Sequence, residues 1–177
     1  EGGGPDSARS ADRCCGSHFV RDWAPAFAGE REGESIVAGS IAFPRLMRVG
    51  AGASMELPQV LAQLGLSRPF LMSDDYLVRS GRAQPLMDAL AAAGMAVRLF
   101  ADTMPEPDVH SIERALAVLR EGAHDCVVAF GGGSPIDSAK AVAVLAVHGG
   151  TCPDYKAPHV QDAAGLPVIA IPTTAWT

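Results

Sequence analysis

A short apolar run, three glycines and a helical pattern follow one another in Val127-Val128-Ala129-Phe130-Gly131-Gly132-Gly133-Ser134-Pro135-Ile136-Asp137-Ser138-Ala139-Lys140-Ala141. Glycine lets the backbone turn sharply and leaves its N–H groups bare, because no Cβ stands in the way. We expect Ser134 to cap the helix and Pro135 to occupy its first position. The positive end of the helix dipole then faces the loop, which predicts an anion site with pyrophosphate as its natural occupant.

Strand and helix patterns alternate on both sides of this loop. The predicted strands are residues 69–73, 95–100, 126–130 and 167–171, and the predicted helices are 54–64, 78–93, 108–121 and 135–147. Such alternation is typical of βαβ units, so we expect an α/β fold with a parallel sheet and helices on its faces. The strand segments are continuously apolar, which predicts burial on both faces.

The remaining N-terminal part divides into two regions. Residues 1–34 are rich in Gly, Ser and charged residues without an apolar period, which predicts a disordered or non-native head before a domain at 35–177. Within that domain, 41–49 is expected to form one or two short strands and 50–53 a turn. Ser54 is expected to cap the helix that follows.

Composition excludes several classes of protein. The chain has 177 residues, is 48% hydrophobic and carries a net charge of −6, which suits a folded domain and disfavours a nucleic-acid binder. The longest apolar run, 141–147, is too short to span a bilayer, and no secretory signal opens the chain. We therefore expect no membrane partner. The cysteines form no disulfide pattern, so we expect a reducing compartment and a cytoplasmic protein.

A metal site is not evident from the sequence. Cys14, Cys15 and His18 could be ligands, but we favour incidental thiols in a mobile head, because a structural zinc site needs four well-spaced ligands.

Four further residues are candidate contacts for a nucleotide. Asp74 directly follows the first predicted strand. A carboxylate there accepts bonds from ribose hydroxyls and repels a 2′-phosphate, which favours NAD over NADP; a turn or helix cap is an equal alternative. Asp137 suits either the helix dipole or a ribose, and a local pair with Lys140 is favoured over catalysis. Thr173 and Thr174 follow the last strand, where hydroxyls could contact phosphate or ribose.

Taken together, these segments resemble the iron-containing (group III) alcohol dehydrogenase family. Gly131–Ala141 is similar to the pyrophosphate loop of that family and Ile169–Ala175 to its second signature. Similar short motifs occur in the same order, at Phe43-Pro44-Arg45, Gly50–Ala53, Ser73-Asp74 and Pro105-Glu106-Pro107. The resemblance covers about residues 41–175.

The resemblance implies a Rossmann-like dinucleotide-binding domain, the N-terminal part of a two-domain dehydroquinate synthase-like fold. It implies hydride transfer between NAD, less so NADP, and a small alcohol or aldehyde, with Fe²⁺ or another divalent metal polarising the substrate oxygen. A homo-oligomeric parent is also implied. The cofactor residues that it implies are Asp74, Gly132, Gly133, Ser134, Asp137, Thr173, Thr174 and Thr177.

The chain departs from the family pattern in three ways. Glu106 stands where many relatives have asparagine, and Trp176 stands where the family has glycine. The family's metal ligands lie in a C-terminal helical domain that is not in this sequence, so we interpret the chain as a cofactor-binding fragment without dehydrogenase activity of its own. The alternatives are a complete, non-catalytic nucleotide-binding module, or a sibling such as a glycerol dehydrogenase or a hydroxyacid–oxoacid transhydrogenase.

Overall fold

The computed structural model describes residues 46–156 and 164–174, and its strands form one parallel sheet in the order β2-β1-β3-β4. The predicted head, residues 1–34, lies outside the described residues. Strand β1 pairs with β2 on one side and with β3 on the other, and β4 lies beyond β3. The strands are β1 (Pro69–Ser73), β2 (Arg98–Phe100), β3 (Cys126–Gly131) and β4 (Val168–Pro172).

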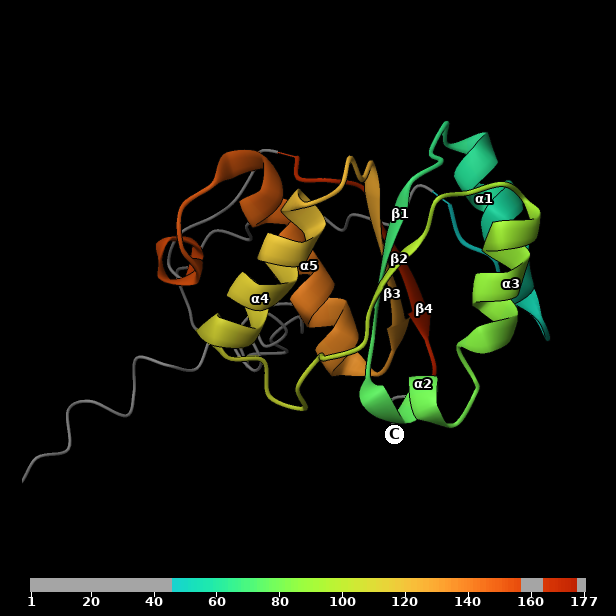
Figure 1. Ribbon diagram of the computed structural model, residues 1–177, viewed down its shortest axis with the longest axis horizontal. Coiled ribbons are helices and arrows are strands. Elements are labelled where there is room, and N and C mark those ends of the chain that lie inside the picture. The colour runs from blue at the N-terminus through green and yellow to red at the C-terminus, as the bar shows by residue number, and fades with distance from the viewer. Residues whose placement is uncertain (1–45, 157–163, 175–177) are drawn as a thin grey trace, which may run out of the picture.

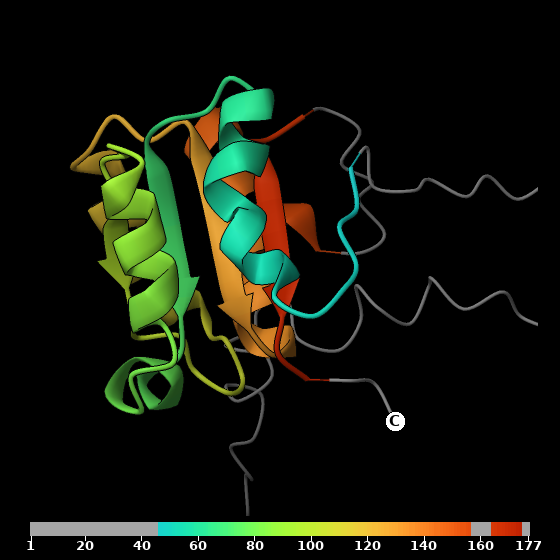
Figure 2. The same ribbon diagram turned by 90° about the vertical axis from the view of Figure 1, so that its right-hand side faces the viewer.

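Helices cover both faces of this sheet, which confirms the predicted α/β architecture (Figures 1 and 2). Helices α1 (Leu57–Gln63) and α3 (Gln84–Ala92) pack on one face, and α4 (Val109–Arg120) and α5 (Gly133–His148) pack on the other. The shorter elements are η2 (Ala53–Glu56), α2 (Asp75–Arg79) and η3 (Cys152–Tyr155).

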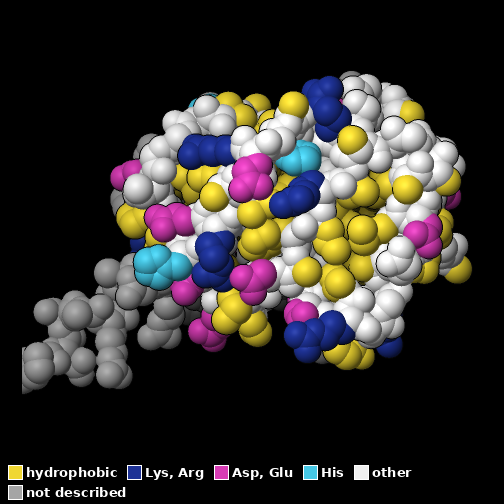
Figure 3. Space-filling view, viewed as in Figure 1, with side chains coloured by type: hydrophobic (Ala, Val, Ile, Leu, Met, Phe, Trp, Pro, Cys, Tyr) yellow, Lys and Arg dark blue, Asp and Glu magenta, His cyan; other side chains and the backbone are white. Residues whose placement is uncertain are grey.

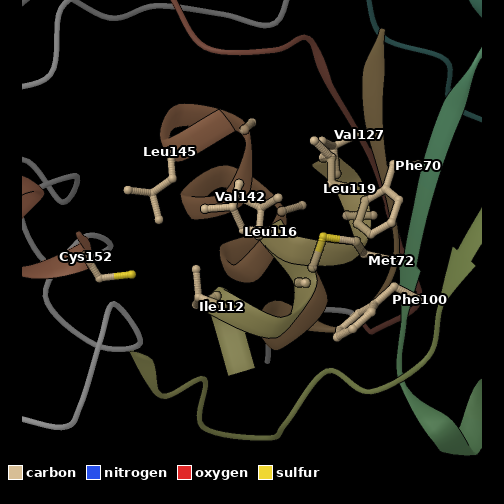
Figure 4. Close-up of a cluster of buried hydrophobic side chains, with 14 residues drawn as sticks. Phe70, Met72, Phe100, Ile112, Leu116, Leu119, Val127, Val142, Leu145 and Cys152 are labelled. Atoms are coloured by element: carbon tan, nitrogen blue, oxygen red, sulfur yellow. The ribbon is translucent and has the colours of Figure 1, made fainter. Parts of the chain in front are cut away.

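The core is divided into two layers by the alternation of side chains along the strands. Phe70 and Met72 of β1 point toward α4 and α5 and belong to one cluster with Ile112 and Val142 (Figure 4). Leu71 points to the other face, against the leucines of α1 and α3. All of β1 is buried, as a central strand between two helical layers requires.

The predicted helix 78–93 is wrong, because the structure has two helices there. Gly81 takes a left-handed φ of 74°, and Pro85, in the first turn of α3, lacks the N–H that a continuous helix would use. Helix α2 therefore starts at Asp75, directly after β1, and Asp74 becomes its N-cap. Gly94 ends α3 with a φ of 71°, as the pattern predicts.

Burial of the last strand also differs from the expectation. Ile169 and Ile171 of β4 are half-buried against the α1 and α3 layer, but the residues that alternate with them are exposed. Strand β4 lies at the edge of the described sheet, so its second face is not covered as those of β1 and β3 are.

The region before α1 is only partly as predicted. The turn at 50–53 is confirmed, with Gly52 at a φ of 77°. Ser54 does not cap a helix, since it lies inside η2. Residues 46–49 form no strand, and the rest of the predicted segment 41–49 lies outside the described residues.

The surface shows no bias of charge on the face seen in Figure 3, where Lys, Arg, Asp and Glu side chains are interspersed. None of the helices in the described ranges is both long and apolar enough to cross a bilayer.

Candidate nucleotide-binding site

The strand order places a topological switch point at the carboxyl ends of β1 and β3. From β1 the chain runs through α3 on one face to β2, and it then crosses by way of α4 on the other face to β3. The loops after β1 and β3 therefore leave toward opposite faces, and open α/β sheets bind their ligands at such a switch point. These loops lie at the lower edge of the sheet in Figure 1.

Asp74 stands on one side of this switch point, directly after β1. Its Oδ1 accepts a hydrogen bond from the Leu77 amide at 2.8 Å, which confirms the cap alternative for this residue. Its Oδ2 lies 3.4 Å from the position that a Cβ on Gly131 would take. One carboxylate oxygen thus fixes the side chain, while the other faces the glycine turn.

The glycine turn stands on the other side of the switch point. Gly131 has a φ of 155°, and a Cβ there would lie 2.6 Å from Cγ of Pro135. Helix α5 begins at Gly133 with Gly132 as its N-cap, two residues earlier than the sequence pattern predicts. The predicted cap at Ser134 and the predicted first position for Pro135 are therefore wrong.

The backbone at the start of α5 is bare. A Cβ on Gly133 would meet no heavy atom within 4 Å, and one on Gly132 would make an ordinary contact of 3.5 Å with Oγ1 of Thr174. The first N–H groups of a helix have no partner within it, and they carry the positive end of its dipole. Glycine is not required at these two positions by the surrounding protein atoms, so the open space is available to a ligand.

Thr173 and Thr174 lie next to the turn. The Thr173 amide donates to the Gly131 carbonyl at 2.9 Å, which extends the pairing of β3 and β4 by one step. Both threonines are exposed. Thr177, the third predicted threonine contact, lies outside the described residues.

Asp137 is the fifth residue of α5, whereas the predicted start at Pro135 would make it the third. Its Oδ1 accepts from Nζ of Lys140 at 3.1 Å, so the predicted local pair is present. The carboxylate is largely buried and the ammonium half-exposed.

Three hydroxyl groups connect the strand ends at this edge. Ser73 donates to the Phe130 carbonyl at 2.8 Å, and Thr103 donates to the Ser73 carbonyl, also at 2.8 Å. Ser134 donates to the Pro105 carbonyl at 2.6 Å. The roles of Ser73 and Thr103 were not predicted; a polar residue ending an apolar strand was the only signal for Ser73, and Thr103 had none.

The described residues do not supply a metal site. No three His, Cys, Asp or Glu side chains within 46–156 and 164–174 gather closely enough to hold an ion. Cys14, Cys15 and His18 lie outside the described residues. Burial, with the nearby Asp125, raises the pKa of the Cys126 thiol to about 12, which makes it a poor ligand and nucleophile.

A parallel, doubly wound sheet with a glycine turn at its switch point defines the class of nucleotide-binding α/β domains. Comparison with known proteins narrows this class, because residues 44–177 match the family model of the iron-containing alcohol dehydrogenases. The chain belongs to that family.

Individual relatives agree with this assignment. The long-chain-alcohol dehydrogenase 1 of Geobacillus thermodenitrificans is 39% identical over 140 residues, which cover 77% of this chain and 35% of that protein. The probable alcohol dehydrogenase EutG of Salmonella typhimurium is 39% identical, with 76% of this chain and 34% of that protein covered. The chain therefore spans about a third of the length of these curated relatives.

Among solved structures, the sulfoacetaldehyde reductase of Bifidobacterium kashiwanohense in complex with NAD⁺ superimposes with a TM-score of 0.69. It is 33% identical, and the match covers 78% of this chain and 36% of that one.

Proposed function

We propose that this domain binds NAD at the carboxyl ends of β1 and β3, with the pyrophosphate at the start of α5. The observation that carries the proposal is the unfilled space above Gly133. Glycine destabilises a helix relative to alanine by roughly 0.5–1 kcal/mol, and no described protein atom requires it there. A phosphate that approaches the bare N–H groups gives a physical reason for glycine at this position.

The roles of the other residues follow from their places around the switch point. Oδ2 of Asp74 accepts from the hydroxyls of the adenosine ribose and disfavours the 2′-phosphate of NADP. Gly132 and the Ser134 amide line the pyrophosphate, and Thr174 contacts it from the β4 side, beside Gly132. Thr173 and Asp137 flank the nicotinamide half, and Thr177 is proposed on the resemblance alone.

The parent protein is proposed to interconvert a small alcohol and an aldehyde or ketone. Bound NAD supplies the hydride acceptor and its reduced form the donor. The relatives' names support an alcohol or aldehyde substrate. The similarity to a sulfoacetaldehyde reductase supports, as the second candidate, a sibling enzyme with a different aldehyde substrate. The described residues do not fit the metal that the family name implies, so no step is assigned to a metal here. Homo-oligomerisation rests on the resemblance, and a cytoplasmic location is supported by the free, buried thiol of Cys126.

Calorimetric titration of the 177-residue chain with NAD, NADP, ADP-ribose and adenosine tests the proposal. We expect NAD and ADP-ribose to bind, NADP to bind more weakly, and adenosine to bind more weakly still, since adenosine lacks the pyrophosphate. Equal affinity for adenosine and ADP-ribose would show that the start of α5 does not hold the phosphates. Added alcohol and Fe²⁺ should produce no NADH from this chain.

A further inference from the structure

The hydroxyl of Ser134 makes a hydrogen bond within the protein. Its Oγ donates to the Pro105 carbonyl at 2.6 Å, and that carbonyl belongs to the loop between β2 and α4. A serine hydroxyl has a single donor hydrogen. Pyrophosphate oxygens accept hydrogen bonds at neutral pH, so the hydroxyl cannot serve them without releasing Pro105.

Pro105 is the middle residue of an exposed arch, residues 104–106. One end of this arch is anchored by Thr103, which is buried and donates to the Ser73 carbonyl at 2.8 Å. The other end is anchored by the buried Pro107 and by Asp108, the N-cap of α4. Residues 104–106 themselves are all exposed.

The bond to Ser134 joins this arch to the helix that starts at the glycine turn. Within the described parts of the chain, residues 104–106 make no other hydrogen bond. The anchors at both ends limit how far the arch can move, but they do not determine whether Pro105 contacts α5. That contact depends on one hydroxyl group.

We propose that Ser134 is a positioning residue, whose hydroxyl holds the arch of residues 104–106 against the start of α5 while its amide faces the pyrophosphate. The inference rests on the proposed function, because the arch borders a ligand site only if pyrophosphate binds at the start of α5. It assigns the two polar groups of one residue to different tasks. Loss of the hydroxyl leaves the N–H groups at the start of α5 in place, but it removes the hydrogen bond that holds the arch beside them.

The expected loss of affinity is modest. A single hydrogen bond between neutral groups contributes a factor of roughly three to ten in an equilibrium. Binding of NAD then has to order the arch, which lowers the observed affinity by about that factor. Removal of a direct phosphate contact would leave the free arch unchanged.

The experiment compares the wild-type chain with Ser134→Ala, Ser134→Thr and Ser67→Ala. Ser67 is a matched control, since its hydroxyl also makes an exposed hydrogen bond, to Asp125 at the opposite edge of the sheet. The first measurement is the ¹⁵N order parameter of the Met104 and Glu106 amides in the ligand-free chain. The second is the dissociation constant for NAD.

Ser134→Ala is expected to lower both order parameters from values typical of rigid backbone, about 0.85, toward those of a flexible loop, below about 0.6. It should also weaken NAD binding roughly three- to tenfold. Ser134→Thr should restore both quantities, and Ser67→Ala should change neither.

Unchanged order parameters in Ser134→Ala would overturn the proposal, and weaker NAD binding with an unchanged arch would make the hydroxyl a phosphate ligand instead. Failure of the wild-type chain to bind NAD would overturn the proposed function, while the order parameters would still decide whether Ser134 holds the arch.

Discussion

Asp74 and Gly131 face each other at the carboxyl ends of β1 and β3, with Oδ2 of Asp74 3.4 Å from the position that a Cβ on Gly131 would take. Asp74 follows β1 and Gly131 ends β3, and these neighbouring strands pair from Pro69 opposite Cys126 to Ser73 opposite Phe130. A carboxylate that is oriented by its own helix cap thus lies beside the turn that exposes the N–H groups of α5. This relationship brings a ribose acceptor and an anion site to one edge of the sheet.

Asp74→Ser should relax the preference for NAD over NADP without unfolding the domain. Serine and aspartate are comparable N-caps, so we expect the free energy of unfolding to change by less than about 0.5 kcal/mol. The ratio of NAD to NADP affinity should fall by about tenfold, because the charge that repels a 2′-phosphate is gone. Titration calorimetry with both cofactors measures this ratio.

Asp75→Ser is the matched control for that variant. It removes the adjacent carboxylate, which is exposed and pairs with Arg79 at 2.8 Å. An equal change in the cofactor ratio for both variants would mean that general surface charge, and not Asp74, sets the preference.

Alanine at Gly131 and at Gly133 should have opposite effects on stability. At Gly131 the new Cβ would meet Pro135 at 2.6 Å, at a φ that side chains rarely adopt, so we expect a loss of about 1–3 kcal/mol in urea unfolding. At Gly133 the Cβ would enter open space inside a helix, so stability should rise by roughly 0.5–1 kcal/mol.

Gly133→Ala should nevertheless weaken NAD binding by tenfold or more, a loss of about 1.4 kcal/mol. The methyl group occupies the space that the pyrophosphate requires. A stabilised variant with unchanged NAD affinity would count against the proposed position of the phosphates.

Asp125 should make stability depend on pH in the acid range. Burial opposes ionisation of this carboxyl, but hydrogen bonds from the Ser67 and Arg68 amides outweigh it and hold its pKa below the ordinary value. A lowered pKa stabilises the folded state above the ordinary pKa, and that contribution is lost as the pH falls through the folded-state pKa.

Asp125→Asn should therefore be less stable than the wild-type chain at pH 7, by about 1–3 kcal/mol. Urea unfolding at pH 7 and in acid should show this difference shrinking as the wild-type carboxyl becomes protonated. A difference that stays constant down to pH 2.5 would rule out the linkage.

Cys126 should resist alkylation in the folded chain. With burial as the main cause, its pKa is about 12, so roughly one thiol in ten thousand is ionised at pH 8. Iodoacetamide at that pH should leave the peptide that contains Cys126 unmodified, as measured by mass spectrometry, and should label it fully in urea. Rapid labelling of the native chain would mean that the start of β3 opens readily.

Local patterns in the sequence predicted most elements of the fold, although some boundaries moved. Helix α4 follows its apolar period and its capping residue Asp108 closely. The start of α5 was predicted two residues too late from Ser134 and Pro135, because their preferences for helix ends were outweighed by the geometry of the turn at Gly131. The break at Gly81 was missed, because apolar spacing continues across it.

The site was predicted only in part. Asp74 and the glycines are visible in the sequence because each directly follows an apolar strand. The engagement of the Ser134 hydroxyl by Pro105 was not visible, since it joins helix α5 to a loop that lies 29 residues earlier in the chain.

The sequence by itself determined the alternation of strands and helices, the glycine turn and the family, because each depends on residue types at short spacing. Only the tertiary structure decided that Asp74 faces Gly131 and that Ser134 holds the arch at Pro105. These contacts follow from the order of the strands, and that order depends on how two helical layers bury their apolar faces on one sheet.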